Sequence, residues 1–184
     1  QGGTAVADVL FGDYNPSGRL TISFPRVEGQ VPIYYNYKKS GRPGDMPHSS
    51  TTRHIDVPNA PLYPFGYGLS YTTFSYSVPQ STQKEYTRQE TISVSVTVTN
   101  TGDRDGEETV QLYVNDKVAS VVRPVKELKA FKKIFLKAGE SKTVQFDISP
   151  LALGFYDAAM NYGVEPGEVE IMTGCNSNDL QTIW

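Results

Sequence analysis

The stretch that decides the fold reads Leu62-Tyr63-Pro64-Phe65-Gly66-Tyr67-Gly68-Leu69-Ser70-Tyr71-Thr72-Thr73-Phe74. Before it the sequence is irregular and rich in proline and glycine, and after it segments of alternating polarity follow one another. Its glycines allow backbone conformations and close approaches that other residues resist, and its aromatic side chains bring large apolar surfaces. We therefore predict a rigid corner that ends a long connection and begins the first strand of a β-sandwich, over residues 73–78. The residues alone also allow an ordinary aromatic-rich turn.

Downstream of this corner the pattern predicts an all-β structure. Apolar and polar residues alternate over 92–99, 109–114 and 144–148, which is typical of half-buried strands. The side chains expected to point inward are Ile92, Val94, Val96, Val98, Val110, Leu112, Val114, Val144, Phe146 and Ile148. Further strands are expected over 128–136, where Lys132 interrupts the alternation, around 169–171 and over 180–184. About seven strands with turns between them match an immunoglobulin-like antiparallel sandwich.

The region upstream of the corner has a different character. Residues 4–11 predict a short helix with Val6, Val9 and Leu10 on one face, and residues 20–24 predict a strand. One helix and one strand need a sheet to cover their apolar faces. We therefore interpret residues 1–27 as the end of an α/β domain whose other parts lie outside this sequence. Prolines and glycines make residues 28–69 a long irregular linker, and residues 70–184 are the β-sandwich domain.

Composition excludes several classes of function. Hydrophobic residues make up 38% of the 184 residues, charged residues 20%, and the net charge is −3. The sequence has no basic stripe for nucleic acid and no apolar run long enough to span a bilayer. Cys175 is the single cysteine, so an internal disulfide is excluded, and a buried small residue is favoured over a reactive thiol.

Polar clusters are few, and each has a structural explanation. Asp103, Asp105, Glu107 and Glu108 fall in a hairpin, where we expect them to be solvated; their spacing does not fit a calcium loop. His48 and His54 have no partners at metal-ligand spacing, so no metal site is predicted. Arg123 interrupts a valine-rich segment, and we favour a contact with a neighbouring domain over a plain surface position.

The amino-acid sequences of several segments resemble those of one enzyme family. Residues 63–74 resemble the junction before the fibronectin-III-like domain of glycoside hydrolase family 3, the β-glucosidase and β-xylosidase group. Residues 3–20 are similar to the closing helix and strand of that family's α/β-sandwich domain, and the linker resembles that of bacterial periplasmic β-glucosidases. Residues 98–102, 106–114, 123–131 and 138–141 resemble its fibronectin-III-like domain in order and spacing. Ala130 and Ala138 depart from it, since glycine and proline are common there.

The resemblance implies a parent enzyme that is a retaining exo-acting β-glycosidase, with a β-glucosidase acting on terminal non-reducing β-D-glucosyl residues as the favoured activity. Its nucleophile would be an aspartate in a barrel domain and its acid/base a glutamate in the second domain, and neither motif occurs here. This segment would thus be structural, without catalytic residues, metal or cofactor. Arg42 and Tyr35 are candidates for contact with substrate at the active-site rim, and interdomain packing is the favoured alternative for both.

The resemblance also implies the partners and the location of the parent. The partners would be the remaining catalytic domains of the same protein and a β-linked oligosaccharide or aryl glycoside as substrate. Nucleic acid and membrane are not expected as partners. The location would be periplasmic or secreted. Two alternatives stay open: a β-xylosidase of the same family, and a stand-alone carbohydrate-binding sandwich that uses exposed tyrosines or Trp184.

Overall fold

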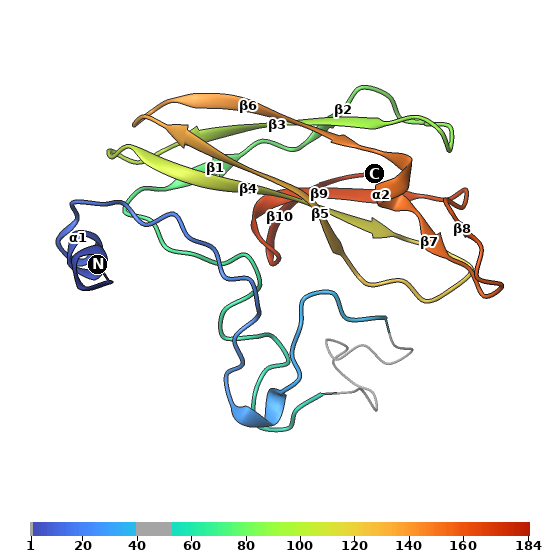
Figure 1. Cartoon of the computed structure of the whole chain (residues 1–184), viewed down its shortest axis with the longest axis horizontal. Helices are drawn as coiled ribbons and strands as arrows, with labels where there is room; N and C mark the ends of the chain where they lie inside the picture. The colour runs from blue at the N-terminus through green and yellow to red at the C-terminus, as the bar shows by residue number, and fades with distance from the viewer. Residues whose placement is uncertain (1, 40–52) are drawn as a thin grey trace.

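The structure, a computed structural model, describes residues 2–39 and 53–184 (Figure 1). The helices and strands, in chain order, are α1 (Gly2–Phe11), η1 (Glu28–Gln30), β1 (Phe74–Tyr76), β2 (Gln80–Ser81), β3 (Ile92–Asn100), β4 (Gly106–Asp116), β5 (Glu127–Leu136), β6 (Ser141–Ile148), α2 (Pro150–Leu153), β7 (Phe155–Tyr156), β8 (Tyr162–Gly163), β9 (Val169–Asn176) and β10 (Asp179–Ile183). None of the helices in these described ranges is long and apolar enough to cross a membrane.

Two antiparallel sheets form the predicted β-sandwich. In one sheet β3 pairs with β1, β2 and β6, and in the other the strand order is β10-β9-β4-β5. Figure 1 shows the two sheets as facing layers, with the irregular part of the chain beside them. The first strand predicted at the corner is confirmed as β1, although it is shorter than expected. The sequence gives no sign of β2, β7 and β8, because two residues are too few to show an alternation.

The sandwich core follows the predicted alternation. Val94, Val96 and Val98 on β3 are at most 1% exposed, while the residues between them are only half-buried. Their facing neighbours come from the other sheet, where Val110 and Leu112 on β4 are also fully buried. Each such side chain contributes about 1.5–3 kcal/mol when it leaves water. A shift of β3 by one residue would bury its hydroxyl groups instead, so the register is strongly specified.

Strand β5 is distorted, although not at Lys132, where the alternation breaks and the pairing with Val110 is regular. The pairing of β5 with β4 shifts register between Leu112 and Tyr113, which marks a bulge. The interrupting Lys132 is exposed, and its ammonium group donates to the backbone carbonyl of Gln145 on β6. Lys142 on β6 donates in return to the carbonyl of Phe135 on β5, at 2.7 Å. Two lysines therefore bridge the edge strands of the two sheets.

The strand predicted over residues 20–24 is wrong as a regular element. This segment instead makes scattered backbone hydrogen bonds to residues 62–67: Leu20 N–H donates to Tyr67 O, and Phe24 N–H donates to Tyr63 O, both at 2.8 Å. Only Phe24 and Tyr63 form a β-bridge. The partner segment contains Pro64 and a glycine with positive φ, so a continuous ladder is prevented. The described part of the linker has only the short helix η1, in keeping with its proline content.

The predicted N-terminal helix is confirmed as α1, beginning two residues earlier than expected. None of its residues is buried. Its large apolar side chains stand out from the rest of the chain, with Val6 59%, Leu10 71% and Phe11 85% exposed. In Figure 1 the helix lies beside the sandwich rather than between its sheets. The described residues thus leave its apolar face uncovered, as the sequence analysis expects.

Candidate functional site

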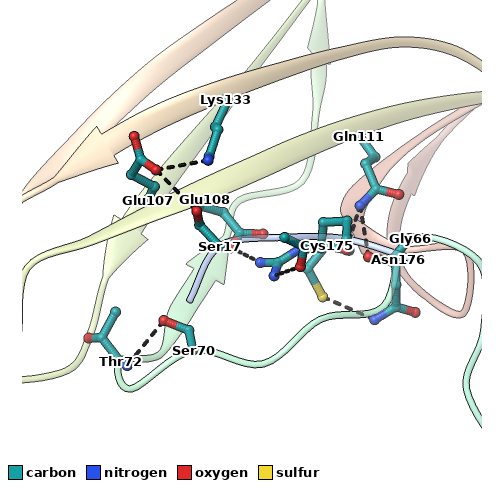
Figure 2. A network of polar contacts seen from close by, with 12 residues as sticks. Ser17, Gly66, Ser70, Thr72, Glu107, Glu108, Gln111, Lys133, Cys175 and Asn176 are labelled. Atoms are coloured by element: carbon teal, nitrogen blue, oxygen red, sulfur yellow. Dashed lines mark hydrogen bonds and ion pairs between the residues drawn. The ribbon is translucent and has the colours of Figure 1, made fainter. Parts of the chain in front are cut away.

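A network of polar contacts joins the irregular part of the chain to the sandwich (Figure 2). Two segments that are distant in sequence, residues 15–19 and 66–72, meet strand β4 here. We call this group the junction network. Its members are Asn15, Ser17, Arg19, Gly66, Ser70, Tyr76, Glu107, Glu108, Gln111, Lys133 and Cys175.

The centre of the network is a buried ion pair between Arg19 and Glu108. Glu108 is 0% exposed, and Arg19 Nη2 donates to its Oε2. Tyr76 OH donates to the other carboxylate oxygen, Oε1, at 2.7 Å. Burial raises the pKa of Glu108, while the guanidinium of Arg19 and the Tyr76 hydroxyl oppose that rise. Burial and then the Glu108 carboxylate raise the pKa of Tyr76, so its hydroxyl stays a donor.

This arrangement corrects the expectation of a solvated acidic cluster for Glu108, whereas Asp103 and Asp105 are exposed as expected. Glu108 is an inward residue of β4, in phase with Val110 and Leu112, and its parity along the strand is the signal that could have identified it. Its partner Arg19 lies 89 residues earlier, so no local motif reveals the pair. Breaking such a buried pair leaves an uncompensated charge and costs about 3–5 kcal/mol.

A second group of contacts fixes the glycine corner. Gln111 Nε2 donates to the carbonyls of Gly66, at 3.1 Å, and Cys175, at 2.6 Å, and Tyr113 OH donates to Gln111 Oε1. Gly66 has φ +81°, and a Cβ at this position would lie 2.0 Å from Gln111 Oε1. The corner therefore requires glycine for both its backbone conformation and its contact. The predicted rigid corner is confirmed, and Cys175 behind it is half-buried.

The outer rim of the network is more exposed. Glu107, next to Glu108 but on the opposite face of β4, pairs with Lys133 at 2.8 Å and accepts from Ser17 Oγ at 3.1 Å. The hydrogen bond from Lys133 lowers the pKa of Glu107. Asn15 Nδ2 donates to the carbonyl of Asp105 at 2.9 Å. This hydrogen bond connects the turn between β3 and β4 to the irregular segment that follows α1.

Tyr35, one of the two candidates for substrate contact, packs against the sandwich. Its ring stacks on Phe65 at a centroid distance of 4.3 Å and meets the edge of Tyr113 at 5.7 Å. Its hydroxyl accepts from the backbone N–H of Leu128 at 3.2 Å. These contacts agree with the favoured reading of interdomain packing. The other candidate, Arg42, lies outside the described residues.

Two further expectations have different outcomes. The contact of Arg123 with a neighbouring domain stays a prediction; within the described residues its guanidinium pairs with Glu127 at 2.6 Å and lies 4.5 Å from the Phe155 ring centroid. Both partners belong to the same sandwich. The backbone N–H of His54 donates to Asn59 Oδ1 at 3.0 Å. His48 lies outside the described residues. Within residues 2–39 and 53–184 no group of three histidine, cysteine or acidic residues is placed to hold a metal ion.

Comparison with protein families gives two matches. Residues 1–71 match the glycosyl hydrolase family 3 C-terminal domain, and residues 108–177 match the fibronectin type III-like domain. The junction network lies where these two parts of the chain meet: Arg19 belongs to the first match and Glu108 to the second.

Similar proteins point the same way. The chain is 51% identical over 179 residues to a periplasmic β-glucosidase of Salmonella typhimurium, covering 96% of this chain and 23% of the relative. It is 46% identical to a β-xylosidase of Formosa agariphila, covering 98% of this chain and 25% of that relative. A crystal structure of a β-glucosidase from Listeria innocua in complex with isofagomine matches with a TM-score of 0.94 and 42% identity, over 100% of this chain and 26% of that one. The chain thus spans about a quarter of the length of the relatives it matches.

Proposed function

We propose that this chain is the C-terminal region of a glycoside hydrolase family 3 enzyme and forms the structural part of a retaining exo-acting β-glycosidase. In this role it holds the fibronectin type III-like sandwich against the domain that carries residues 1–27. The preferred activity of the whole protein is that of a β-glucosidase, which removes terminal non-reducing β-D-glucosyl residues. The names of the relatives support this activity.

The observation that carries the structural role is the junction network. A retaining glycosidase needs a nucleophilic carboxylate and an acid/base carboxyl about 5–5.5 Å apart, both facing the sugar. Glu107 and Glu108, the adjacent acidic pair of β4, are engaged by Lys133 and Arg19 and point to opposite faces of the sheet. They serve attachment rather than catalysis, and the catalytic pair belongs to other domains.

The uncovered face of α1 supports the same proposal. Val6, Leu10 and Phe11 form an apolar surface that an α/β domain would bury, and boundaries at residues 27 and 69 remain part of the proposal. The match to the family 3 C-terminal domain extends to residue 71, close to the second boundary. The proposed partners are therefore the catalytic domains of the same protein, with a β-linked oligosaccharide or aryl glycoside as substrate.

Activity assays test the proposal directly. The purified 184-residue chain is expected to release no chromophore from aryl β-glucosides. A longer protein that contains this chain and the catalytic domains is expected to do so. Turnover by the chain alone, surviving further purification, would refute the structural role. An aryl β-xyloside assayed in parallel separates β-glucosidase from β-xylosidase, an activity that the Formosa relative carries in its name.

A carbohydrate-binding module is the second candidate function. Trp184 is 70% exposed, and the ammonium group of Lys117 lies 4.2 Å from its ring centroid. Exposed aromatic rings of this kind stack on sugar rings in binding modules. Retention of the chain on insoluble glucan, lost in Trp184→Ala, would favour this function over a purely structural one. The periplasmic relative favours a periplasmic or secreted location, which fractionation of the source cells would test.

A further inference from the structure

Two side chains from the sandwich region hold the C-terminal end of α1. The hydroxyl of Tyr71, in the segment that leads into β1, donates to the carbonyl of Val9 at 2.6 Å. Arg104, in the turn between β3 and β4, donates from Nη2 to the carbonyl of Gly12 at 3.1 Å. Its guanidinium also lies 5.5 Å from the centroid of the Tyr71 ring. Because the two side chains contact each other as well as the end of the helix, we call them the helix clamp.

The helix α1 has few means of its own to stay helical. It has ten residues, and isolated helices shorter than about 12–15 residues are marginal in water. Half of its residues favour the helix poorly, namely Gly2, Gly3, Thr4, Val6 and Val9. None of its residues is buried, its first turn has no acidic residue, and its last turn has no basic one. The stability of α1 in this chain therefore depends on contacts made from outside the helix.

The helix clamp supplies contacts of this kind. The last four carbonyls of an α-helix have no partner within the helix. The backbone N–H groups of Gly12 and Tyr14 donate to the carbonyls of Val9 and Asp8, at 3.2 and 3.0 Å. The clamp adds a second donor at Val9 and a donor at Gly12. The guanidinium of Arg104 also brings a positive charge to the negative end of the helix dipole, where a cation is favourable.

The clamp leaves the apolar face of α1 free, because it binds only backbone carbonyls. The exposed side chains of this face are Val6, Leu10 and Phe11. Residues 1–71 match a glycosyl hydrolase family 3 C-terminal domain, and most of the length of the relatives lies outside this chain. Both observations favour the rest of that domain as the partner that covers the face.

We propose that the helix clamp keeps α1 helical before that partner covers it, so that the sandwich presents a preformed docking surface to the α/β domain. A preformed surface lowers the conformational entropy that docking costs. The identity of the covering domain rests on the proposed function, whereas the clamp itself does not.

Amide hydrogen exchange of the isotopically labelled 184-residue chain, followed by NMR, tests the clamp. The amides of residues 8–12 are expected to exchange more slowly than in an unstructured peptide. Tyr71→Phe keeps the ring and removes the hydroxyl, and Arg104→Met keeps the apolar stem and removes the guanidinium. Each variant should raise the exchange rates of these amides about two- to tenfold, the effect of one hydrogen bond, and leave the amides of β3 unchanged.

Arg88→Met and Tyr156→Phe are the matched controls. Arg88 is exposed in the loop between β2 and β3, and Tyr156 is 57% exposed on β7. Both controls should exchange as the unsubstituted chain does. An unprotected α1 in the unsubstituted chain, or unchanged rates in both clamp variants, would overturn the proposal. A rise of the same size in β3 would show a general loss of stability instead of release of the helix, and would overturn it too.

Exchange followed by mass spectrometry in a longer protein that contains the α/β domain tests the partner. The segment 2–14 should exchange there at least about tenfold more slowly than in the 184-residue chain, since burial of even one large apolar side chain stabilises the helix by that factor. Equal exchange in both proteins would mean that no domain covers the face, and would overturn the docking surface. Neither measurement depends on glycosidase activity, so failure of this proposal is distinguishable from failure of the proposed function.

Discussion

Removal of one partner from the Arg19–Glu108 pair should destabilise the chain strongly. The two side chains are 11% and 1% exposed, so Arg19→Met leaves the Glu108 carboxylate buried without its counter-charge. The expected cost is about 3–5 kcal/mol. For a chain of this size each kcal/mol lowers Tm by about 2–4 °C, so Tm should fall by roughly 6–20 °C. Urea unfolding followed by circular dichroism gives the free energy, and a thermal scan gives Tm.

The double variant Arg19→Met/Glu108→Leu separates charge from packing. It removes both charges together, so the remaining cost comes mainly from the Tyr76 hydroxyl, which loses its acceptor, and is about 1–3 kcal/mol. Adding Tyr76→Phe should recover most of that loss. A cost below about 1 kcal/mol for Arg19→Met, or a double variant as costly as the sum of the singles, would refute the buried-pair argument.

The pH dependence of Arg19→Met gives an independent check. Burial raises the pKa of Glu108 in the folded chain above its unfolded value, and Arg19 counteracts this rise. A raised carboxyl pKa favours folding at low pH, and that contribution is lost as pH rises through the folded pKa. Without Arg19 the rise is larger, so acidification from neutral pH should recover more stability in Arg19→Met than in the unsubstituted chain. An identical pH dependence for both would contradict the electrostatic account.

Three further predictions follow from local contacts. Gly66→Ala should lower the free energy of unfolding by about 1–3 kcal/mol through its backbone conformation, and further through the clash with Gln111. The control Gly139→Ala, with φ +73° and no neighbour within 4 Å, should lower it less. Urea unfolding measures both, and equal losses would argue against the clash. Burial raises the pKa of the Cys175 thiol to about 12. Iodoacetamide should therefore label this thiol slowly in the folded chain at neutral pH and faster in urea. Fast labelling of the folded chain would contradict the burial of the thiol. Tyr35→Ala should destabilise the chain by about 1–3 kcal/mol through the loss of two ring contacts, and a change within about 0.5 kcal/mol would mean that the aromatic cluster is not formed.

The sequence predicts the sandwich well because its strands carry their own register. On β3 the alternation of valine with serine and threonine determines which face is buried, and the observed burial follows it residue by residue. The turn at Gly139 is likewise a local property, with φ +73°. Elements of two residues, such as β2 and β7, depend on what they pack against and leave no pattern to read.

The junction network was missed because its contacts join distant parts of the chain. Glu108 looks like one of several acidic residues in a hairpin, and only its phase along β4 indicates that it points inward. Arg123 gives a similar lesson: its partners Glu127 and Phe155 are brought to it by the closure of the sandwich, and no local sequence pattern indicates them. Residues 20–24 alternate like a strand, but their partner segment is broken by proline and glycine.

The lysine bridges between β5 and β6 have a consequence for self-association. Lys132 and Lys142 occupy the carbonyls of Gln145 and Phe135, which an added strand from another molecule would otherwise use. Association in concentrated preparations should therefore start from the exposed apolar face of α1 and disperse in mild detergent, rather than from strand addition at the β5 and β6 edges.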